Sequence, residues 1–409
     1  ALIHAATMVT AGVYLIARCA PLWNASSDAR VLAGSIGALT AITGAVLGCA
    51  QWDIKRILAY STMSQIGYMI MGVGVGAYDA GVLHFFTHAF FKAQLFLGAG
   101  IIIHNLANEQ DVRLMGGLRK QMPFAFWAMT IGVLSICGIP GFAGFFSKDA
   151  VLSDTLAHGH PIMWAVGVIT AGLTAYYMFR MLFVTFFGAY RGHVDPSELG
   201  LRHPELAGTA AAAGHHPEEE AHHAHHAPAW LMSAPVAILM VPTVLIGWLD
   251  FGGESSPWGQ YFAPLFGHYE PTTSTPPEAL TSLLVLVLVA AGITVAYLRY
   301  AAPAALADAV PRLRAETVRM PSALVNAFYF DAAIDALFVK PSAALGRFFS
   351  SVIDPRVIDA GVREASISAS WLGHLFRSFQ TGLVRAYALA LAFGAACFAI
   401  YYVVIGAGR

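Results

Sequence analysis

The sequence predicts an all-α integral membrane protein. Of its 409 residues, 57% are hydrophobic and only 11% are charged, whereas soluble domains carry about 25% charged residues. Apolar runs long enough to cross a bilayer recur along the chain, and about 20 apolar residues span the hydrocarbon core as a helix. With a net charge of −1, the chain has no excess of basic residues of the kind that is typical of nucleic-acid-binding proteins. We therefore expect a multi-pass helical bundle with no nucleic-acid partner.

The apolar runs predict where helices cross the membrane. The first begins at once, without an initiator Met, a basic segment or a cleavage site ahead of it. We therefore expect the chain to be the C-terminal part of a longer protein with further helices. Each run has the length of one span except one, which is too long for a straight crossing. The predicted spans are 2–18, 31–50, 57–76, 81–105, 122–157, 161–188, 230–250, 279–298 and 382–406.

The long run 122–157 is interrupted by GIPGFAG at 138–144. Proline and clustered glycines release backbone groups from the helix, which predicts either a simple kink or a discontinuous helix. Broken helices of transporters expose dipole ends and carbonyl groups to ions. Because Ser147, Lys148 and Asp149 follow closely, we favour a functional break and expect Lys148 in the first turn after it. The helix dipole there would disfavour its ammonium, which Asp149 would oppose if its carboxylate turned toward the amine.

The segment LHFFTHAFFKAQLFL carries three ionisable residues inside an apolar run. His84, His88 and Lys92 are four residues apart, so they lie on one face of a helix with about 6 Å of rise between neighbours. A single histidine there would more often be a hydrogen-bonded core residue. Ionisable groups at membrane depth are costly and usually functional, and three on one face indicate a path for protons. Lysines in a poorly hydrated interior lose their charged form readily, and histidines are natural relays between them.

Basic residues are distributed unequally between the two sides of the membrane. Alternating the spans places three of them on one side and twelve on the other, and the positive-inside rule makes the second side cytoplasmic. The segment 251–278, rich in Gly, Pro, Ser and Thr, then becomes an external loop. The cytoplasmic connection 190–228 holds eight histidines, but their spacing fixes no coordination geometry, and we expect no defined metal site. Four scattered cysteines provide no ligand set for a redox centre.

The segment 327–379 is helical in character but carries a charge every few residues. It cannot span a membrane, although at 1.5 Å per residue it reaches roughly 75 Å as a helix. An amphipathic helix of this kind lies along a surface, while an ordinary cytoplasmic linker is the alternative. Pro341 and Pro355 would kink the helix without ending it. We expect a long lateral amphipathic helix followed by a final transmembrane anchor at 382–406.

Five segments occur in an order that resembles a known family. LIHAATMVTAGVYLI, DIKRILAYSTMSQIGYM, HFFTHAFFKAQLFL, EQDVRLMGGL and GIPGFAGFFSKD are similar to the antiporter-like subunit L family of bacterial NADH:quinone oxidoreductase, respiratory complex I. Large subunits of multisubunit Na⁺/H⁺ antiporters share the same module. The resemblance implies sixteen transmembrane helices with two inverted five-helix repeats, each repeat containing one broken helix.

In that arrangement the chain begins at the eighth helix and keeps an antiporter-like helical bundle with one broken helix. The resemblance and the predicted spans together give seven segments. These are 1–27, the last helix of the first half; 28–189, the second five-helix repeat; 190–228, the histidine-rich loop; 229–300, two further spans; 301–326, a cytoplasmic loop; 327–379, the lateral helix; and 380–409, the terminal anchor.

The resemblance also implies roles for individual residues in a proton relay. Lys92 resembles the central connecting lysine of the family, and Lys148 resembles the terminal lysine that hands the proton to the outer side, with Asp149 beside it. His84 and His88 match the histidines that lead to the central lysine. The relay is completed by His4, which matches the histidine that bridges the two half-channels.

The expected function is proton translocation by a membrane-arm subunit, driven by redox chemistry elsewhere in the complex. The chain itself would hold no cofactor, while NADH, FMN, Fe–S clusters and quinone would bind in partner subunits. Other membrane-arm subunits would contact the lateral helix, and the bacterial inner membrane would be the location. Two alternatives stay open: a large subunit of a Na⁺/H⁺ antiporter, and a purely structural clamp.

Overall fold

The computed structural model describes most of the chain as helices. The described residues are 3, 7–192, 229–251, 255–266, 278–301, 321–378, 380 and 382–406. His4, nearly all of the histidine-rich connection and most of the predicted loop 301–326 lie outside them. Contacts divide the chain into two units, residues 1–328 and 329–409, which are described separately below.

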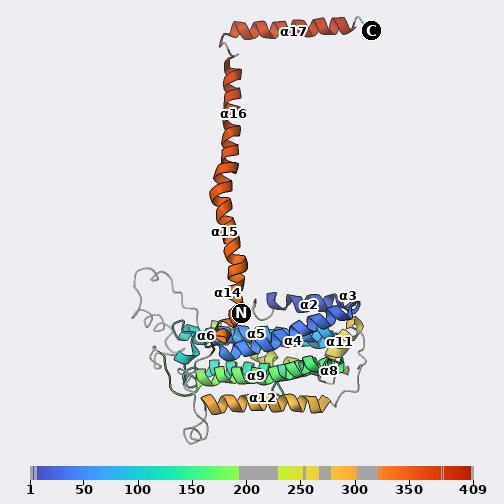
Figure 1. The fold of residues 1–409 in the computed structure, drawn as a ribbon, viewed down its shortest axis with the longest axis vertical. Coiled ribbons are helices and arrows are strands. Elements are labelled where there is room, and N and C mark those ends of the chain that lie inside the picture. Colours follow the sequence, from blue (N-terminus) through green and yellow to red (C-terminus); the bar gives the residue numbers. More distant parts are fainter. Residues whose placement is uncertain are drawn as a thin grey trace. The chain divides into compact units, whose positions relative to one another are not determined.

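The larger unit contains five consecutive helices in the range predicted for the second repeat, and one of them is broken in two (Figure 1). Asp53 begins the second of them, because its side chain accepts a hydrogen bond from the N–H of Arg56, 3.0 Å away. The helices are α4 (Ser27–Ala50), α5 (Ile54–Val75), α6 (Tyr78–Asn105), α7 (Pro123–Cys137) with α8 (Ala143–Ala157), and α9 (Pro161–Phe186).

Helices α4 and α5 approach each other very closely. A Cβ atom on Gly37 would lie 2.4 Å from the backbone nitrogen of Met71, and one on Gly67 would lie 2.3 Å from that of Ala41. Only glycine permits such an approach of two helix backbones. Small residues at helix interfaces are typical of membrane proteins, where close packing replaces the hydrophobic effect as the source of association.

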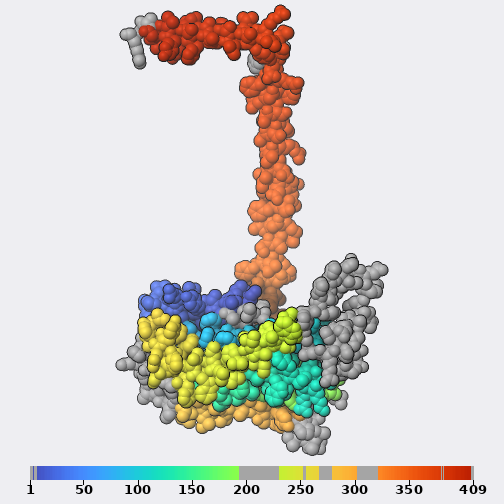
Figure 2. All heavy atoms as spheres, turned by 180° about the vertical axis from the view of Figure 1, so that it is seen from behind, coloured from blue at the N-terminus to red at the C-terminus, as the bar shows by residue number. Residues whose placement is uncertain are grey.

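Further helices flank the five. On the N-terminal side these are η1 (Met8–Thr10), α2 (Ala11–Arg18) and α3 (Ala20–Asn24), and after the undescribed connection they are α10 (Ala229–Leu245), η4 (Ile246–Asp250), α11 (Pro257–Phe266) and α12 (Glu278–Tyr300). Figure 2 shows α10 and α11 together on one face of this unit, and both contact α6.

Helix α11 corrects the prediction that 251–278 is only a loop. Trp258, Phe262 and Phe266 recur every four residues and therefore share one face. The ring of Trp258 stacks on Phe86 at a centroid distance of 5.5 Å, and Phe266 lies 5.5 Å from Tyr78. These aromatic contacts hold the short helix against α6, despite the glycine and proline around it.

Six described helices are long and apolar enough to cross a membrane, which identifies a multi-pass membrane protein. They are Ser27–Ala50, Tyr78–Asn105, Pro161–Phe186, Trp230–Asp250, Ala279–Tyr300 and Val384–Gly406. Helix α5, predicted as a span at 57–76, is also 22 residues long but carries more polar side chains, including Ser61 and Gln65. These polar residues are buried rather than exposed, so they face other helices.

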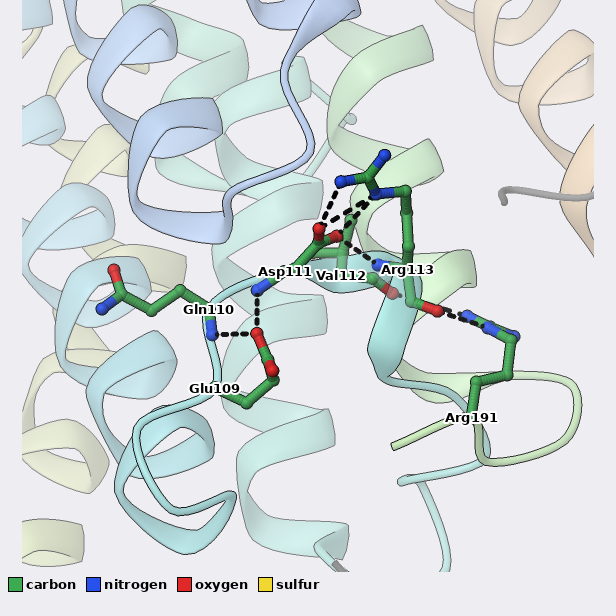
Figure 3. Close-up of polar contacts among 6 residues, drawn as sticks. All are labelled: Glu109, Gln110, Asp111, Val112, Arg113 and Arg191. Carbon is green, nitrogen blue, oxygen red and sulfur yellow. Dashed lines mark hydrogen bonds and ion pairs between the residues drawn. The ribbon is translucent and has the colours of Figure 1, made fainter. Parts of the chain in front are cut away.

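Figure 3 shows how the loop after α6 is held at one end of the bundle. Asp111 accepts hydrogen bonds from the N–H and the guanidinium of Arg113, with Oδ2 2.5 Å from Nη2. The carboxylate of Glu109 accepts from the N–H of Asp111, 2.7 Å away. Arg191 follows α9 and donates to the carbonyl oxygens of Arg113 and Val184, at 2.8 and 2.9 Å. The loop is therefore bound to the end of α9.

The smaller unit consists of the predicted lateral helix and the last span. Contiguous helical segments run from Phe330 to Ser378: α14 (Phe330–Ile334), η9 (Asp335–Val339), α15 (Lys340–Phe348), η10 (Phe349–Ile358) and α16 (Asp359–Ser378). The helix continues through Pro341 and Pro355, as predicted. The π-helical stretches η9 and η10 occur where these prolines disturb the backbone hydrogen bonds of the helix. The final apolar helix is α17 (Val384–Gly406).

Candidate functional site

The candidate site begins at the break between α7 and α8. Helix α7 ends at Cys137, and Gly138 follows with a φ of 74°, the left-handed conformation in which glycine commonly ends helices. The N–H groups of Gly138 and Ile139 bind the carbonyl oxygens of Ser135 and Leu134, at 3.0 and 3.1 Å. A further carbonyl of this last turn, that of Ile136, remains for another donor.

Lys148 supplies that donor from the other side of the break. Its Nζ lies 2.7 Å from the carbonyl oxygen of Ile136 and 5.3 Å from the centre of the Tyr68 ring. The side chain is 2% exposed. The lysine therefore connects the two half-helices and places its amine at the C-terminal, negative end of α7.

The position of Lys148 along α8 differs from the prediction. Helix α8 starts at Ala143, so Lys148 is its sixth residue and lies in the second turn, whereas we predicted the first. The effect of a helix dipole falls off within the first turn. The N-terminus of α8 therefore acts on this amine less than the prediction assumed, because the five-residue interruption ends earlier than the motif GIPGFAG suggests.

Asp149 lies next to Lys148 in sequence but bonds to a different helix. Its Oδ2 accepts a hydrogen bond from the hydroxyl of Ser282 on α12, 2.7 Å away. The lysine amine, by contrast, reaches back to α7. The two neighbouring side chains thus join α8 to two different parts of the bundle.

The three ionisable residues predicted on one face of α6 are all fully buried. His84 makes contacts through both ring nitrogens: Nδ1 is 2.9 Å from Ser147 Oγ, and Nε2 is 3.1 Å from Gln65 Oε1. The rings of His84 and His88 are 6.4 Å apart between centroids. The face of α6 that carries these three residues therefore contacts α8 at Ser147, directly beside Lys148.

Lys92 is bound to the backbone of α5. Its Nζ lies 2.8 Å from the carbonyl oxygen of Leu58 and also donates to the hydroxyl of Ser61. The same carbonyl accepts from the Ser61 hydroxyl at 2.9 Å and from Thr62 Oγ1 at 3.0 Å. The carbonyl oxygen of Leu58 thus accepts hydrogen bonds from three side chains, one of which is Lys92.

Sequence reasoning gave no role in the relay to the neutral polar residues of the site. Gln65 and Ser147 bind His84, and Thr87 Oγ1 lies 2.7 Å from Ser147 Oγ. The signal for them was present in α5, whose segment STMSQ is too polar for a helix that faces lipid. Among the described buried atoms, Ser64 Oγ, Gln65 Nε2 and Gln94 Oε1 have no hydrogen-bond partner, and buried polar atoms of this kind usually bind ordered water.

A second group of titratable side chains lies at the far end of α8. Arg30 Nη1 and His158 Nε2 would lie 3.0 and 3.4 Å from a Cβ atom on Gly76. Burial lowers the pKa of His158 from its usual range, and the charges of His160 and Arg30 lower it further, while its hydrogen bond to the Asp154 backbone and the charge of Asp79 act in the opposite direction. No group of three or more described His, Cys, Asp or Glu residues forms a candidate metal site.

Comparisons with known proteins agree with this arrangement. The family described as "NADH:quinone oxidoreductase/Mrp antiporter, TM" matches residues 1–174. NAD(P)H-quinone oxidoreductase chain 5 of Picosynechococcus sp. is 41% identical over 97% of this chain and 59% of that relative. NADH-quinone oxidoreductase subunit L of Mycobacterium tuberculosis is 39% identical over 99% of this chain and 59% of its own length.

A solved structure shows the same fold. It is the Mrp complex from Dietzia sp. DQ12-45-1b, with 22% identity and a TM-score of 0.52, and the match covers 98% of this chain and 37% of that one. The chain spans about three fifths of the length of the curated relatives it matches. It belongs to the family of antiporter-like membrane subunits found in NADH:quinone oxidoreductases and Mrp antiporters, with relatives named subunit L or chain 5.

Proposed function

We propose that this chain moves protons through a buried lysine and histidine relay, as part of a membrane-arm subunit of NADH:quinone oxidoreductase in the bacterial inner membrane. The observation that carries the proposal is the pair of buried lysines, Lys92 on α6 and Lys148 on α8, with His84 between them in contact with α8. Two buried amines with polar partners are costly in a membrane and have a functional reason by default.

In this proposal each lysine alternates between a charged form held by backbone carbonyls and a neutral form that has released its proton. Lys92 is the central site, and the carbonyl of Leu58 with the hydroxyl of Ser61 stabilises its ammonium. Lys148 is the terminal site and uses the carbonyl of Ile136. His84 and His88 pass protons between the two lysines with the help of water. Asp149, the residue after Lys148, supplies a carboxylate that is bound to Ser282 of α12.

Redox chemistry in partner subunits would drive the cycle, and those subunits would hold NADH, FMN, Fe–S clusters and quinone. The lateral helix and the anchor would attach the chain to other membrane-arm subunits. Their apolar side chains support this role, because Leu337, Phe338 and Trp371 are exposed in this chain, and exposed apolar surface of this extent indicates an interaction site.

The test replaces Lys92 or Lys148 by Met in the assembled complex and measures protons pumped per NADH oxidised. Each replacement should lower the ratio while assembly and the redox cofactors remain intact. Lys55→Met is the matched control, because Lys55 is exposed at the start of α5. An unchanged ratio in both buried-lysine variants would refute the relay. A ratio that depends on Na⁺ instead of pH would favour the Na⁺/H⁺ antiporter alternative.

A further inference from the structure

Gln65 has a place in the site that the relay itself does not explain. It lies on α5 and is fully buried, and its Oε1 is 3.1 Å from Nε2 of His84. On the other side of the ring, Nδ1 is 2.9 Å from the hydroxyl of Ser147. The histidine of α6 is therefore held between α5 and α8, with a different kind of partner at each nitrogen.

The two partners differ in what they can do. A neutral imidazole has one N–H donor and one acceptor nitrogen. An amide oxygen can only accept, so with Gln65 Oε1 facing the ring, Nε2 must carry the proton. Nδ1 is then an acceptor, and the Ser147 hydroxyl donates to it. Ser147 can in turn accept from the hydroxyl of Thr87, 2.7 Å away.

These hydrogen bonds form a chain with a single direction. Thr87 donates to Ser147, Ser147 donates to His84, and His84 donates to Gln65. The hydroxyls of Thr87 and Ser147 also lie 3.2 and 3.4 Å from the carbonyl oxygens of His84 and Ala143, but both distances are longer than those along the chain. The direction is set at its end, because reversing it would require a donor where the Gln65 oxygen lies.

We propose that Gln65 is a positioning residue that holds His84 in the tautomer with its proton on Nε2. Nδ1 is then the basic atom of the ring, so His84 takes up and returns protons on the side of Ser147, the residue that precedes Lys148. The tautomer stands on geometry alone, while its part in transfer rests on the proposed function.

The test reads the protonation of each ring nitrogen by solid-state NMR of the assembled complex labelled with ¹⁵N-histidine. The His84 signals are those lost in His84→Gln. Gln65→Glu keeps an acceptor oxygen, whereas Gln65→Met has a similar size and none. Gln94→Met is the matched control, because Gln94 is another buried glutamine but donates to the carbonyl oxygen of Ala128, 2.6 Å away.

We expect a protonated Nε2 in the unmodified protein, in Gln65→Glu and in Gln94→Met. In Gln65→Met the proton should move to Nδ1, where Ser147 can accept it. A proton on Nδ1 of the unmodified protein would overturn the proposal, and so would a tautomer that Gln65→Met leaves unchanged. A residue that only fills space would give the same spectrum in Gln65→Glu and Gln65→Met.

Pumping measurements separate this inference from the proposed function. Gln65→Met should lower the protons pumped per NADH, and Gln65→Glu should retain more of the ratio. Normal pumping with an altered tautomer would overturn the part of Gln65 in transfer. If the Lys92 and Lys148 replacements also pumped normally, the relay itself would be wrong, whatever the spectrum of His84 showed.

Discussion

Lys148 donates to the carbonyl oxygen of Ile136 across the break, with 2.7 Å between the two atoms. The break frees this carbonyl from the helical ladder, and the lysine that follows the break occupies it. The free carbonyl of Ile136 and the buried amine of Lys148 therefore depend on each other. Without its partner, either would be an unpaired buried polar group, which costs about 1–3 kcal/mol or more.

Replacing Lys148 by arginine should separate charge from proton transfer. Arginine keeps a donor for the Ile136 carbonyl but does not release its proton in the working range of pH. We therefore expect Lys148→Arg to assemble, yet to pump as poorly as Lys148→Met. Native gels and proton uptake by inverted membrane vesicles measure the two properties. Pumping by the arginine variant at the normal ratio would show that Lys148 does not need to deprotonate.

Removing the Ser61 hydroxyl should disturb Lys92 specifically. Ser61 accepts from the lysine and donates to Leu58, so Ser61→Ala removes one partner of a buried ammonium, at a cost of about 1–3 kcal/mol. The pH at which pumping falls by half should shift downward, since the ammonium loses a stabilising contact. Thr62→Val is the control, because Thr62 binds the same carbonyl without contacting the lysine. Equal shifts in both variants would contradict this account.

Stability should depend on pH through His158. Burial lowers its pKa below the usual value of 6.5, so the folded protein binds fewer protons than the unfolded chain in the window just below that value. Its stabilising contribution is complete above pH 6.5 and is lost as the pH falls through the lowered pKa. Between pH 5 and pH 7.5, the unfolding temperature of His158→Asn should fall less steeply on acidification than that of the unmodified protein. The exposed His104 gives a control variant, and equal pH profiles in both variants would refute the prediction.

Deleting residues 327–409 should weaken attachment to neighbouring subunits. The deletion removes a long helix with exposed apolar side chains such as Phe330 and Leu372, which bury against a partner in our proposal. Loss of distal subunits on native gels is the expected result, with the lysine sites of the bundle still present. A complex that stayed fully assembled and pumped normally would show that this segment is not a clamp.

Local sequence signals predicted the elements better than the contacts between them. Apolar runs located the spans, and the four-residue spacing of His84, His88 and Lys92 predicted a buried stripe. The motif at 138–144 predicted the break. The partners of these groups come from other helices: Gln65 and Ser61 from α5, for example. Such contacts depend on the relative rotation of whole helices, which no local pattern encodes.

The close approach of α4 and α5 has a consequence for how the site can work. With Gly37 and Gly67 against the opposing backbone, the two helices cannot slide or roll without a clash, so they form a fixed frame. Helix α5 is part of this frame, so the positions of Leu58, Ser61 and Gln65 relative to one another stay constant. Changes in the site must then come from rotating side chains and from the half-helix α8, which is held to α7 by the turn between them, by the hydrogen bond from the N–H of Gly144 to Ser135 Oγ and by Lys148.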